Sequence, residues 1–425
     1  MRSAVTRALA AAGASVLTIG LLGLAPGTAH AQTGALERGT TTKADAGLAL
    51  KAGGFGTQVK GGQIPGGSDE TAYISLSCAT RTGQQRENHV AGAQLPGAGT
   101  VSGITTKLWT TKTGGAIHSY AQNTTANVVL SESPLGSIEI SALKSLSHAW
   151  HDEKGFHAET SVSVAKLLFV PPVGAPQELD IPTPGQPIEI PGVAVISIGG
   201  TSKIVNDHAG IANANVLHVK LIPSGTVVTV GHTTARVLDG IKHGTFRGSS
   251  AGTQVKALDD NLSSNRNPLS LMPCQGTDGE VQTKELAGVD LAGQIVVEGL
   301  RSSQQGTQLA KKSVAMERGS IASLNLGGGA LVVDAVAGQA NVTRTARGKV
   351  TSNAKGTTVG SITVNGEPQE LPLNDPIEIP GLAKIEPKVI EKTRWGISVV
   401  ALRITLLDGT GAVIDLGIAQ AAIRG

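Results

Sequence analysis

Residues 136–147 read Gly-Ser-Ile-Glu-Ile-Ser-Ala-Leu-Lys-Ser-Leu-Ser, a stretch in which apolar and polar side chains nearly alternate. Successive side chains of a β-strand point to opposite faces, so a period of two predicts a strand with one buried face. The alternation assigns to that face the even positions, which are Ile138, Ile140, Ala142, Lys144 and Leu146.

Similar strands surround this stretch in pairs. Residues 99–130 and 136–169 each read as a long strand, a glycine turn and a returning strand, with turns at Gly114-Gly115 and at Gly155. A third pair, 193–198 and 216–221, follows a proline-rich connection. We predict long antiparallel β-hairpins and no helix beyond the N-terminus.

The composition agrees with sheets. Glycine contributes 56 of the 425 residues, whereas Phe, Tyr and Trp number 4, 2 and 3. A chain with so few rings must build its cores from small aliphatic and β-branched side chains, which fit a pleated surface, while glycine supplies the turns.

The chain contains an internal repeat, with one sequence unit present in two copies. Gly-Thr-Gln-Val-Lys stands at 56–60 and again at 252–256, and Pro-Ile-Glu-Ile-Pro-Gly at 187–192 and again at 376–381. The alternation of apolar residues also recurs in the second copy. Leu217, Val219 and Leu221 are matched there by Leu402, Ile404 and Leu406. A slip of one residue would invert every side chain, so shared parity indicates a shared register.

The repeats set the predicted domains: a signal peptide at 1–31, a flexible segment at 32–50, repeat 1 at 51–245 and repeat 2 at 246–425. We predict two tandem all-β units, resembling β-sandwiches and packed on each other. The alternative is a β-solenoid, which would need a short coil period throughout.

The N-terminus has the features of an export signal. Arg2 and Arg7 precede an apolar stretch at 8–24, and Ala29-His30-Ala31 is a small-residue cleavage pattern. We therefore expect cleavage after Ala31, a secreted mature chain and no membrane span or C-terminal anchor in it.

The charge balance argues against nucleic acid as a partner. The formal net charge is +3, and removal of the two signal arginines leaves about +1, whereas phosphate binding requires a basic face. The expected partner is a cell-wall polymer or another surface protein, and no cofactor is predicted.

One cysteine lies in each repeat, Cys78 in the first and Cys274 in the second. For an exported protein the options are a Cys78–Cys274 bridge, an intermolecular bridge or two free thiols. The internal bridge is favoured, provided that a pseudo-two-fold arrangement brings the equivalent residues together.

Gly-Ser-Ser-Ala-Gly at 248–252 matches the Gly-x-Ser-x-Gly nucleophile pattern. That chemistry requires a strand-to-helix turn and a histidine later in the chain. No helix is predicted after Ser250, and no histidine follows His243. A loop is therefore the favoured interpretation, and we predict no catalytic residue.

Other candidate groups have equally simple explanations. A metal site is suggested by a cluster of potential ligands: His148, His151, His157, Asp152 and Glu153. However, the odd spacing of His148 and His151 places their side chains on opposite faces of a strand. A polar hairpin tip is therefore the favoured interpretation. The acidic candidates for sugar hydrolysis are interpreted as strand-face residues: Glu139, Glu159, Glu189 and Glu378.

The three tryptophans, Trp109, Trp150 and Trp395, are the candidates for sugar stacking. Core or hairpin-edge positions are favoured for each, with Trp150 on the same even face as Ile138.

Several motifs taken together resemble the choice-of-anchor P family of secreted actinobacterial proteins. They are Phe-Gly-Thr-Gln-Val at 55–59, Leu-Pro-Gly at 95–97 after Cys78, 136–143, 188–192 and 400–409. The resemblance implies an exported repeat body and carries over no activity and no site residue. We therefore predict a non-enzymatic structural or binding protein, with a cell-wall or polysaccharide-binding module as the alternative.

Overall fold

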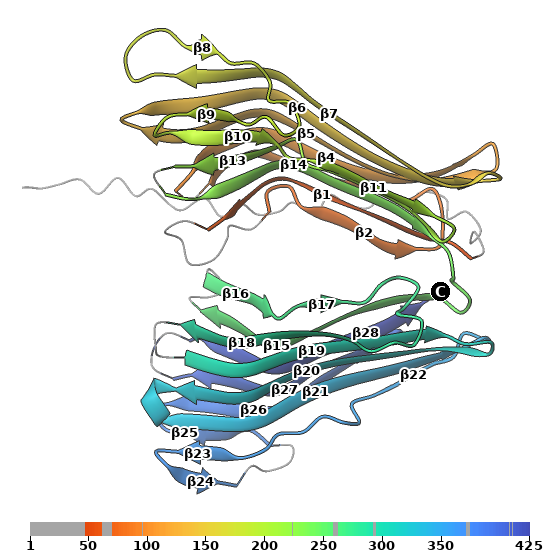
Figure 1. Cartoon of the computed structure of the whole chain (residues 1–425). Helices are drawn as coiled ribbons and strands as arrows, with labels where there is room; N and C mark the ends of the chain where they lie inside the picture. The colour runs from red at the N-terminus through yellow and green to blue at the C-terminus, as the bar shows by residue number, and fades with distance from the viewer. Residues whose placement is uncertain are drawn as a thin grey trace, which may run out of the picture. The chain divides into compact units, whose positions relative to one another are not determined.

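β-Strands form nearly all of the regular structure in the computed structural model of the chain (Figure 1). The structure describes residues 47–61, 70–95, 97–222, 224–257, 262–291, 295–370, 375–407, 409 and 411–425. Within these ranges the one helical segment is a 3-10 turn at Gly327–Gly329, and no described helix is long and apolar enough to cross a membrane. The predicted all-β class is confirmed, whereas the signal peptide, its cleavage site and residues 32–46 lie outside the described residues.

The first two antiparallel sheets pack face to face and form sandwich 1 (Figure 1). Sheet 1A consists of β1 (Ala49–Lys60), β2 (Ile74–Ala79), β9 (Ile188–Ile190), β10 (Ala194–Ile198), β11 (Thr201–Asn206), β12 (Ala209–Ala214), β13 (Leu217–Leu221) and β14 (Val227–Leu238). Sheet 1B consists of β3 (Gln85–Leu95), β4 (Gly99–Thr113), β5 (Ala116–Ser133), β6 (Gly136–Asp152), β7 (Gly155–Val170) and β8 (Gln177–Glu178).

Two further antiparallel sheets form sandwich 2. Sheet 2A consists of β15 (Thr245–Ala257), β16 (Leu262–Asn267), β17 (Ser270–Leu271), β25 (Ile377–Ile379), β26 (Ala383–Thr393), β27 (Gly396–Leu406) and β28 (Val413–Arg424). Sheet 2B consists of β18 (Gln282–Leu291), β19 (Ile295–Gln308), β20 (Lys312–Leu326), β21 (Leu331–Thr345), β22 (Val350–Asn353), β23 (Ile362–Val364) and β24 (Glu367–Gln369).

The two sandwiches follow one plan. Sheets 1B and 2B are meanders in which neighbouring strands are consecutive from β3 to β8 and from β18 to β21, and β1 pairs with β14 as β15 pairs with β28. They differ where Gly199 packs against Asn215 and divides one long hairpin into β10–β13 and β11–β12. The equivalent hairpin of sandwich 2, β26–β27, is continuous. These open, antiparallel sheets fit the sandwich prediction rather than the solenoid alternative.

In each meander, one residue on every central strand has no cross-strand partner in the ladder, and these residues lie side by side in a row across the sheet. In sheet 1B, Gly103, Ala126 and Ala142 lie on neighbouring strands, and the partners on both sides of them keep one register. Gly103 and Ala142 have φ angles of 59° and 51°, in the left-handed region. Gly299 and Ala335 have the same role in sheet 2B, with φ angles of 60° and 53°. At this row the side chains that point into the core change from one set of alternate positions to the other on each strand. The pairing register between neighbouring strands is the same on both sides of the row.

This row corrects the predicted buried face of β6. Ile138 and Ile140 are buried as expected, but beyond Ala142 the buried positions are odd and include Leu143 and Ala149. Leu146 therefore lies on the opposite face from Ile138. The alternation could not show this, because alanine seldom adopts a left-handed φ and nothing in its sequence context signals one.

The row also divides each interior into two kinds of core. On one side, aliphatic side chains such as Ile138 and Leu217 form the main cluster of sandwich 1. On the other side, buried polar residues are interspersed with smaller apolar clusters, such as Leu50 with Phe156 in sandwich 1 and Phe246 with Ile397 in sandwich 2. Among the polar residues there, Ser147 Oγ lies 3.0 Å from Thr233 Oγ1 of the facing sheet. Hydrogen bonds of this kind satisfy many of the buried hydroxyls, whereas Ser145 Oγ and Thr253 Oγ1 have no partner among the described residues.

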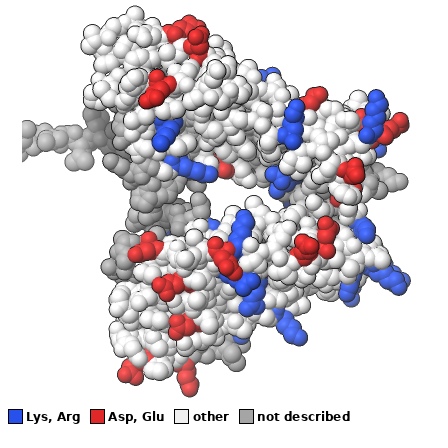
Figure 2. All heavy atoms as spheres, in the orientation of Figure 1, with Lys and Arg blue, Asp and Glu red and all other residues white. Residues whose placement is uncertain are grey.

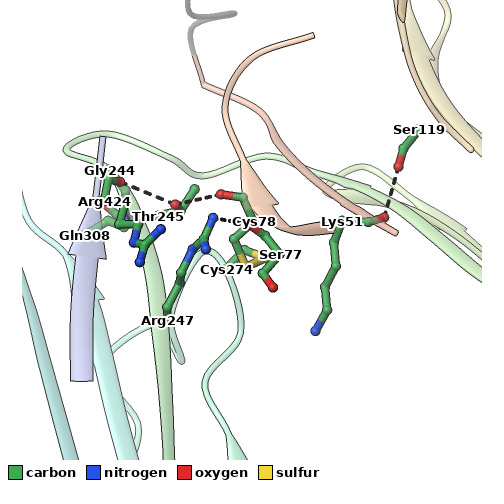
Figure 3. Close-up of a disulfide and its surroundings, with 10 residues drawn as sticks. All are labelled: Lys51, Ser77, Cys78, Ser119, Gly244, Thr245, Arg247, Cys274, Gln308 and Arg424. Carbon is green, nitrogen blue, oxygen red and sulfur yellow. Dashed lines mark hydrogen bonds between the residues drawn. A yellow bond between two sulfur atoms is a disulfide. The ribbon is translucent and has the colours of Figure 1, made fainter. Parts of the chain in front are cut away.

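A buried disulfide joins the sandwiches, as predicted. The Cα atoms of Cys78 and Cys274 lie 5.4 Å apart, and both side chains are buried. Thr245 Oγ1 donates a hydrogen bond of 2.8 Å to the Cys78 carbonyl, and the Arg247 guanidinium donates to the Ser77 carbonyl (Figure 3).

Candidate binding surface

Five flat rings stack side by side across the outer face of sheet 1B. Their centroids are 4.8 Å apart for Trp109–Tyr120, 4.1 Å for Tyr120–His148, 4.4 Å for His148–Trp150 and 4.7 Å for Trp150–His157. The interplanar angles along this series range from 9° to 18°. We call these five residues the ring stack.

Strand register brings the rings together. Trp109, Tyr120 and His148 are direct cross-strand partners on β4, β5 and β6, and Trp150 is the partner of His157 on β7. Residues paired in this way have side chains in contact, and aromatic pairs contribute most when offset or stacked.

The ring stack faces away from the core. The residues that alternate with it, including Thr110, Ser119 and Ala149, are buried between the sheets, whereas all five rings keep part of their surface exposed. The side chains of His148 and His157 are 15% and 31% exposed.

Burial in the stack keeps its central imidazole neutral. The pKa of His148 is lowered to about 4, first by burial and then by the charge of His118. Burial also lowers the pKa of His118, and its Nδ1 lies 3.0 Å from His148 Nε2. Two neutral imidazoles can share one N–H···N hydrogen bond, whereas two imidazolium ions cannot.

A hydrogen bond between a histidine and an aspartate ends the stack at the β6–β7 turn. His157 Nε2 lies 2.9 Å from Asp152 Oδ1, and the Lys154 amide donates a hydrogen bond of 2.8 Å to the same oxygen. These two hydrogen bonds, that from His157 above all, lower the pKa of Asp152. The polar hairpin tip expected here is therefore present.

The tryptophans do not occupy core positions. Trp109 and Trp150 belong to the ring stack, so the expected burial of Trp150 beside Ile138 is wrong, because the strand turns over at Ala142. Trp395 lies in the β26–β27 turn, a hairpin edge, with the guanidinium carbon of Arg394 4.6 Å from its ring.

Sequence reasoning singled out His148, His157 and two of the tryptophans but not Tyr120 or His118. A usable signal exists in the sequence. Three consecutive predicted strands carry a ring at position i and, on two of them, another at i+2. This spacing places the rings on one surface only when the pairing register of these strands is known.

The metal and carboxylate candidates are not assembled into sites. His151 lies on the inner face of β6 against Phe156, and the described residues contain no group of three metal-ligating side chains. Glu189 belongs to β9 of sheet 1A and Glu378 to β25 of sheet 2A. Glu159 lies 3.9 Å from His148, its partner on β6. Glu139 pairs instead with Leu168, nine residues further along β7, so the two carboxylates do not face each other.

Ser250 of the nucleophile pattern lies inside β15 and is fully buried. Its Oγ is 2.8 Å from Glu317 Oε2 and 3.1 Å from the Ser303 carbonyl. Ser250 Oγ donates to Glu317 Oε2. Burial raises the pKa of Glu317 to about 9, so its carboxyl group is protonated at neutral pH and cannot take the serine proton as a general base would. This geometry is that of a buried hydrogen-bond chain and lacks the exposed turn that a nucleophile elbow requires.

The corresponding face of sheet 2B carries no rings. Its matching rung consists of Gln305, Met316, Asn341 and Asn353, which are cross-strand partners in that order. The ring stack is therefore specific to sandwich 1.

Comparison with known proteins gives no assignment. No family model matches the chain, and no curated protein matches it. One solved structure, a mutant of the vaccine antigen transferrin-binding protein B from Haemophilus parasuis, aligns over 88% of this chain and 75% of its own. Its identity is 8% and its TM-score is 0.09, values too low to support an argument about fold or function.

Proposed function

We propose that the chain is an exported, non-enzymatic β-sheet protein with a structural or binding role in the cell envelope or extracellular space. We further propose that the outer face of sheet 1B is its binding surface. The ring stack carries this proposal. Sheet 2B builds the same meander with Gln305, Met316 and Asn341 in place of the rings, so the rings are not needed to form such a sheet.

The chemistry of the stack favours a polysaccharide, and a cell-wall polymer is the first candidate. Trp109 has one ring neighbour among the described residues, Tyr120, which leaves its other face without a ring partner. Indole N–H, phenol O–H and imidazole nitrogen groups line the same strip, and a glycan presents both C–H faces and hydroxyl groups to such a strip. Another surface protein is the alternative partner, because tryptophan and tyrosine are also enriched at protein interfaces.

Two features support the proposed export. A disulfide such as Cys78–Cys274 persists in oxidising compartments, and the N-terminal signal pattern agrees with that location. Membership of the choice-of-anchor P family remains a proposal that rests on the sequence motifs alone.

Retention of the mature protein on isolated cell walls and on immobilised glycans tests the binding role. We expect Trp109→Ala to weaken retention about tenfold, since losing one hot-spot ring costs on the order of 1–2 kcal/mol. The matched control is Gln305→Ala on the corresponding rung of sheet 2B, which we expect to leave retention unchanged. No retention of the wild type on any wall fraction or glycan would sink the polysaccharide proposal.

A broad hydrolase screen tests the non-enzymatic assignment. We expect no turnover that depends on Ser250. Turnover by the wild type that disappears in a folded Ser250→Ala variant would overturn it.

A further inference from the structure

The turns at one end of sandwich 2 carry a concentration of positive charge. The exposed cations there are Lys311 in the β19–β20 turn, Arg347 and Lys349 in the β21–β22 turn, Arg394 in the β26–β27 turn and Arg424 at the end of β28. We call these five residues, with Arg344 beside them, the basic end.

Hydrogen bonds hold these turns together. The Ala346 amide donates to the Lys311 carbonyl at 3.0 Å, which joins two of the turns, and the Ile423 amide donates to the Trp395 carbonyl at 3.0 Å. The Arg344 guanidinium carbon lies 5.9 Å from the Trp395 ring and so connects the two pairs. The cations therefore belong to one surface.

Among the described residues, no carboxylate side chain forms an ion pair with any of the six cations of this surface. At the opposite end of sandwich 2, β24, β25 and the segments beside them carry four exposed acidic residues: Glu367, Glu370, Asp375 and Glu378. Three other exposed acids, Asp278, Glu280 and Glu391, lie nearer the basic end. In the lower half of Figure 2 the outermost atoms at the right are blue and those at the left are red, and both colours meet at the centre.

The Arg344 guanidinium packs against Gly348 and Gly425 within this surface. Its Nε and Nη1 atoms are shielded from solvent and have no hydrogen-bond partner among the described residues. Withdrawing a guanidinium from water without a partner is costly. An oxyanion held by the exposed cations around Arg344 would compensate part of this charge.

The corresponding end of sandwich 1 has the opposite character. Its turns carry Asp152, Glu153, Asp207 and Asp239 beside Lys112 and Lys154. Since the two ends are built from matching hairpins, the fold does not demand cations at this position.

We propose that the basic end binds an anionic glycan, a polysaccharide that carries phosphate or carboxylate groups. Guanidinium groups recognise both oxyanions through paired hydrogen bonds. A nucleic acid fits less well, because base stacking needs several free aromatic faces and the one indole here has Arg394 over its ring. This site is distinct from the ring stack and does not depend on it.

Binding of the full mature protein to four probes tests this proposal: polygalacturonate, a phosphomannan, neutral dextran and single-stranded DNA. We expect binding to one or both anionic glycans, which weakens as salt rises, and none to dextran. The triple variant R347Q/K349Q/R394Q should weaken that binding at least about tenfold and reduce the salt slope by about two, as expected for the loss of three ionic contacts. Preference for polygalacturonate or phosphomannan identifies the oxyanion.

The matched control K112Q/K154Q/K203Q removes the same charge from sandwich 1, where Lys203 is an exposed residue of β11 in the hairpin that carries Asp207, and should change affinity less than about twofold. A further variant, R344Q, should weaken binding, and its melting temperature shows whether the fold persists. Equal losses in the triple variant and its control, no binding of either anionic glycan, or DNA binding as tight as glycan binding would each overturn the proposal.

Discussion

The meanders of sandwiches 1 and 2 show how one backbone plan can carry two different chemistries. At matched positions, sheet 1B has His148 on its outer face and Ala121 in its core, whereas sheet 2B has Asn341 and Glu317. Each sandwich thus holds a titratable group that the other lacks at the matched position. Burial lowers the pKa of His148 and raises the pKa of Glu317. The register survives these exchanges because backbone pairing and the row of left-handed residues do not depend on them.

The contact that joins the two sandwiches should produce the largest effect. Replacing Cys78 and Cys274 by serine opens a loop of 196 residues and should lower the free energy of unfolding by roughly 4–5 kcal/mol in the chain-entropy account. Urea unfolding of the double variant measures this loss. A difference below about 1 kcal/mol would mean that the remaining contacts, such as Thr245 with Cys78, already fix the sandwiches.

Glu317 should make stability fall as pH rises. Its folded-state pKa of about 9 lies above the ordinary value of 4.5, so between these values the folded protein holds a proton that the unfolded chain has lost. Stability should therefore decline by up to about 1.4 kcal/mol per pH unit over that window. Urea unfolding between pH 6 and 8 should show this decline in the wild type and not in Glu317→Gln, and equal slopes would contradict the assignment.

His148 should act in the opposite direction and over a lower range. Its folded-state pKa of about 4 lies below 6.5, so the unfolded chain binds the proton first and stability is lost as pH falls from 6.5 towards 4. Between pH 6.5 and 5 the loss should reach at most about 2 kcal/mol. NMR titration separates His148 from His232, whose pKa burial also lowers to about 4. A His148 midpoint near 6.5 would show that the stack does not desolvate it.

The ring contacts themselves should give the smallest effect. A double-mutant cycle on Tyr120 and His148 should give a coupling of about 0.5–1.5 kcal/mol, the range for stacked aromatic pairs. The matched cycle on Met316 and Asn341 of sheet 2B should give less than about 0.5 kcal/mol. Equal couplings would remove the energetic distinction between the two outer faces.

Much of the sandwich plan was predictable from local pattern. The hairpins at 99–130 and 136–169 were placed close to β4–β7, and the expected turns at Gly114-Gly115 and Gly155 separate those strands. The matched parity of Leu217 and Leu402 is also confirmed, since both side chains are fully buried. These features depend on alternation and on glycine, which are properties of neighbouring residues.

Other features depended on contacts between distant residues. The left-handed Ala142 has no sequence signature, so the face of Trp150 was assigned wrongly. The burial of Glu317 against Ser250 depends on two facing sheets, and their sequence separation of 67 residues gives no hint of it. The ring stack likewise required the register of four strands.

The sequence by itself determined the all-β class, the hairpin pattern and the candidate cysteine pair, because backbone periodicity, turn residues and residue counts are local. Only the tertiary structure decided which face each ring occupies, how Cys78 meets Cys274 and where the cations of the basic end gather. Those outcomes follow from strand register and sheet packing, which bring together residues that the chain keeps far apart.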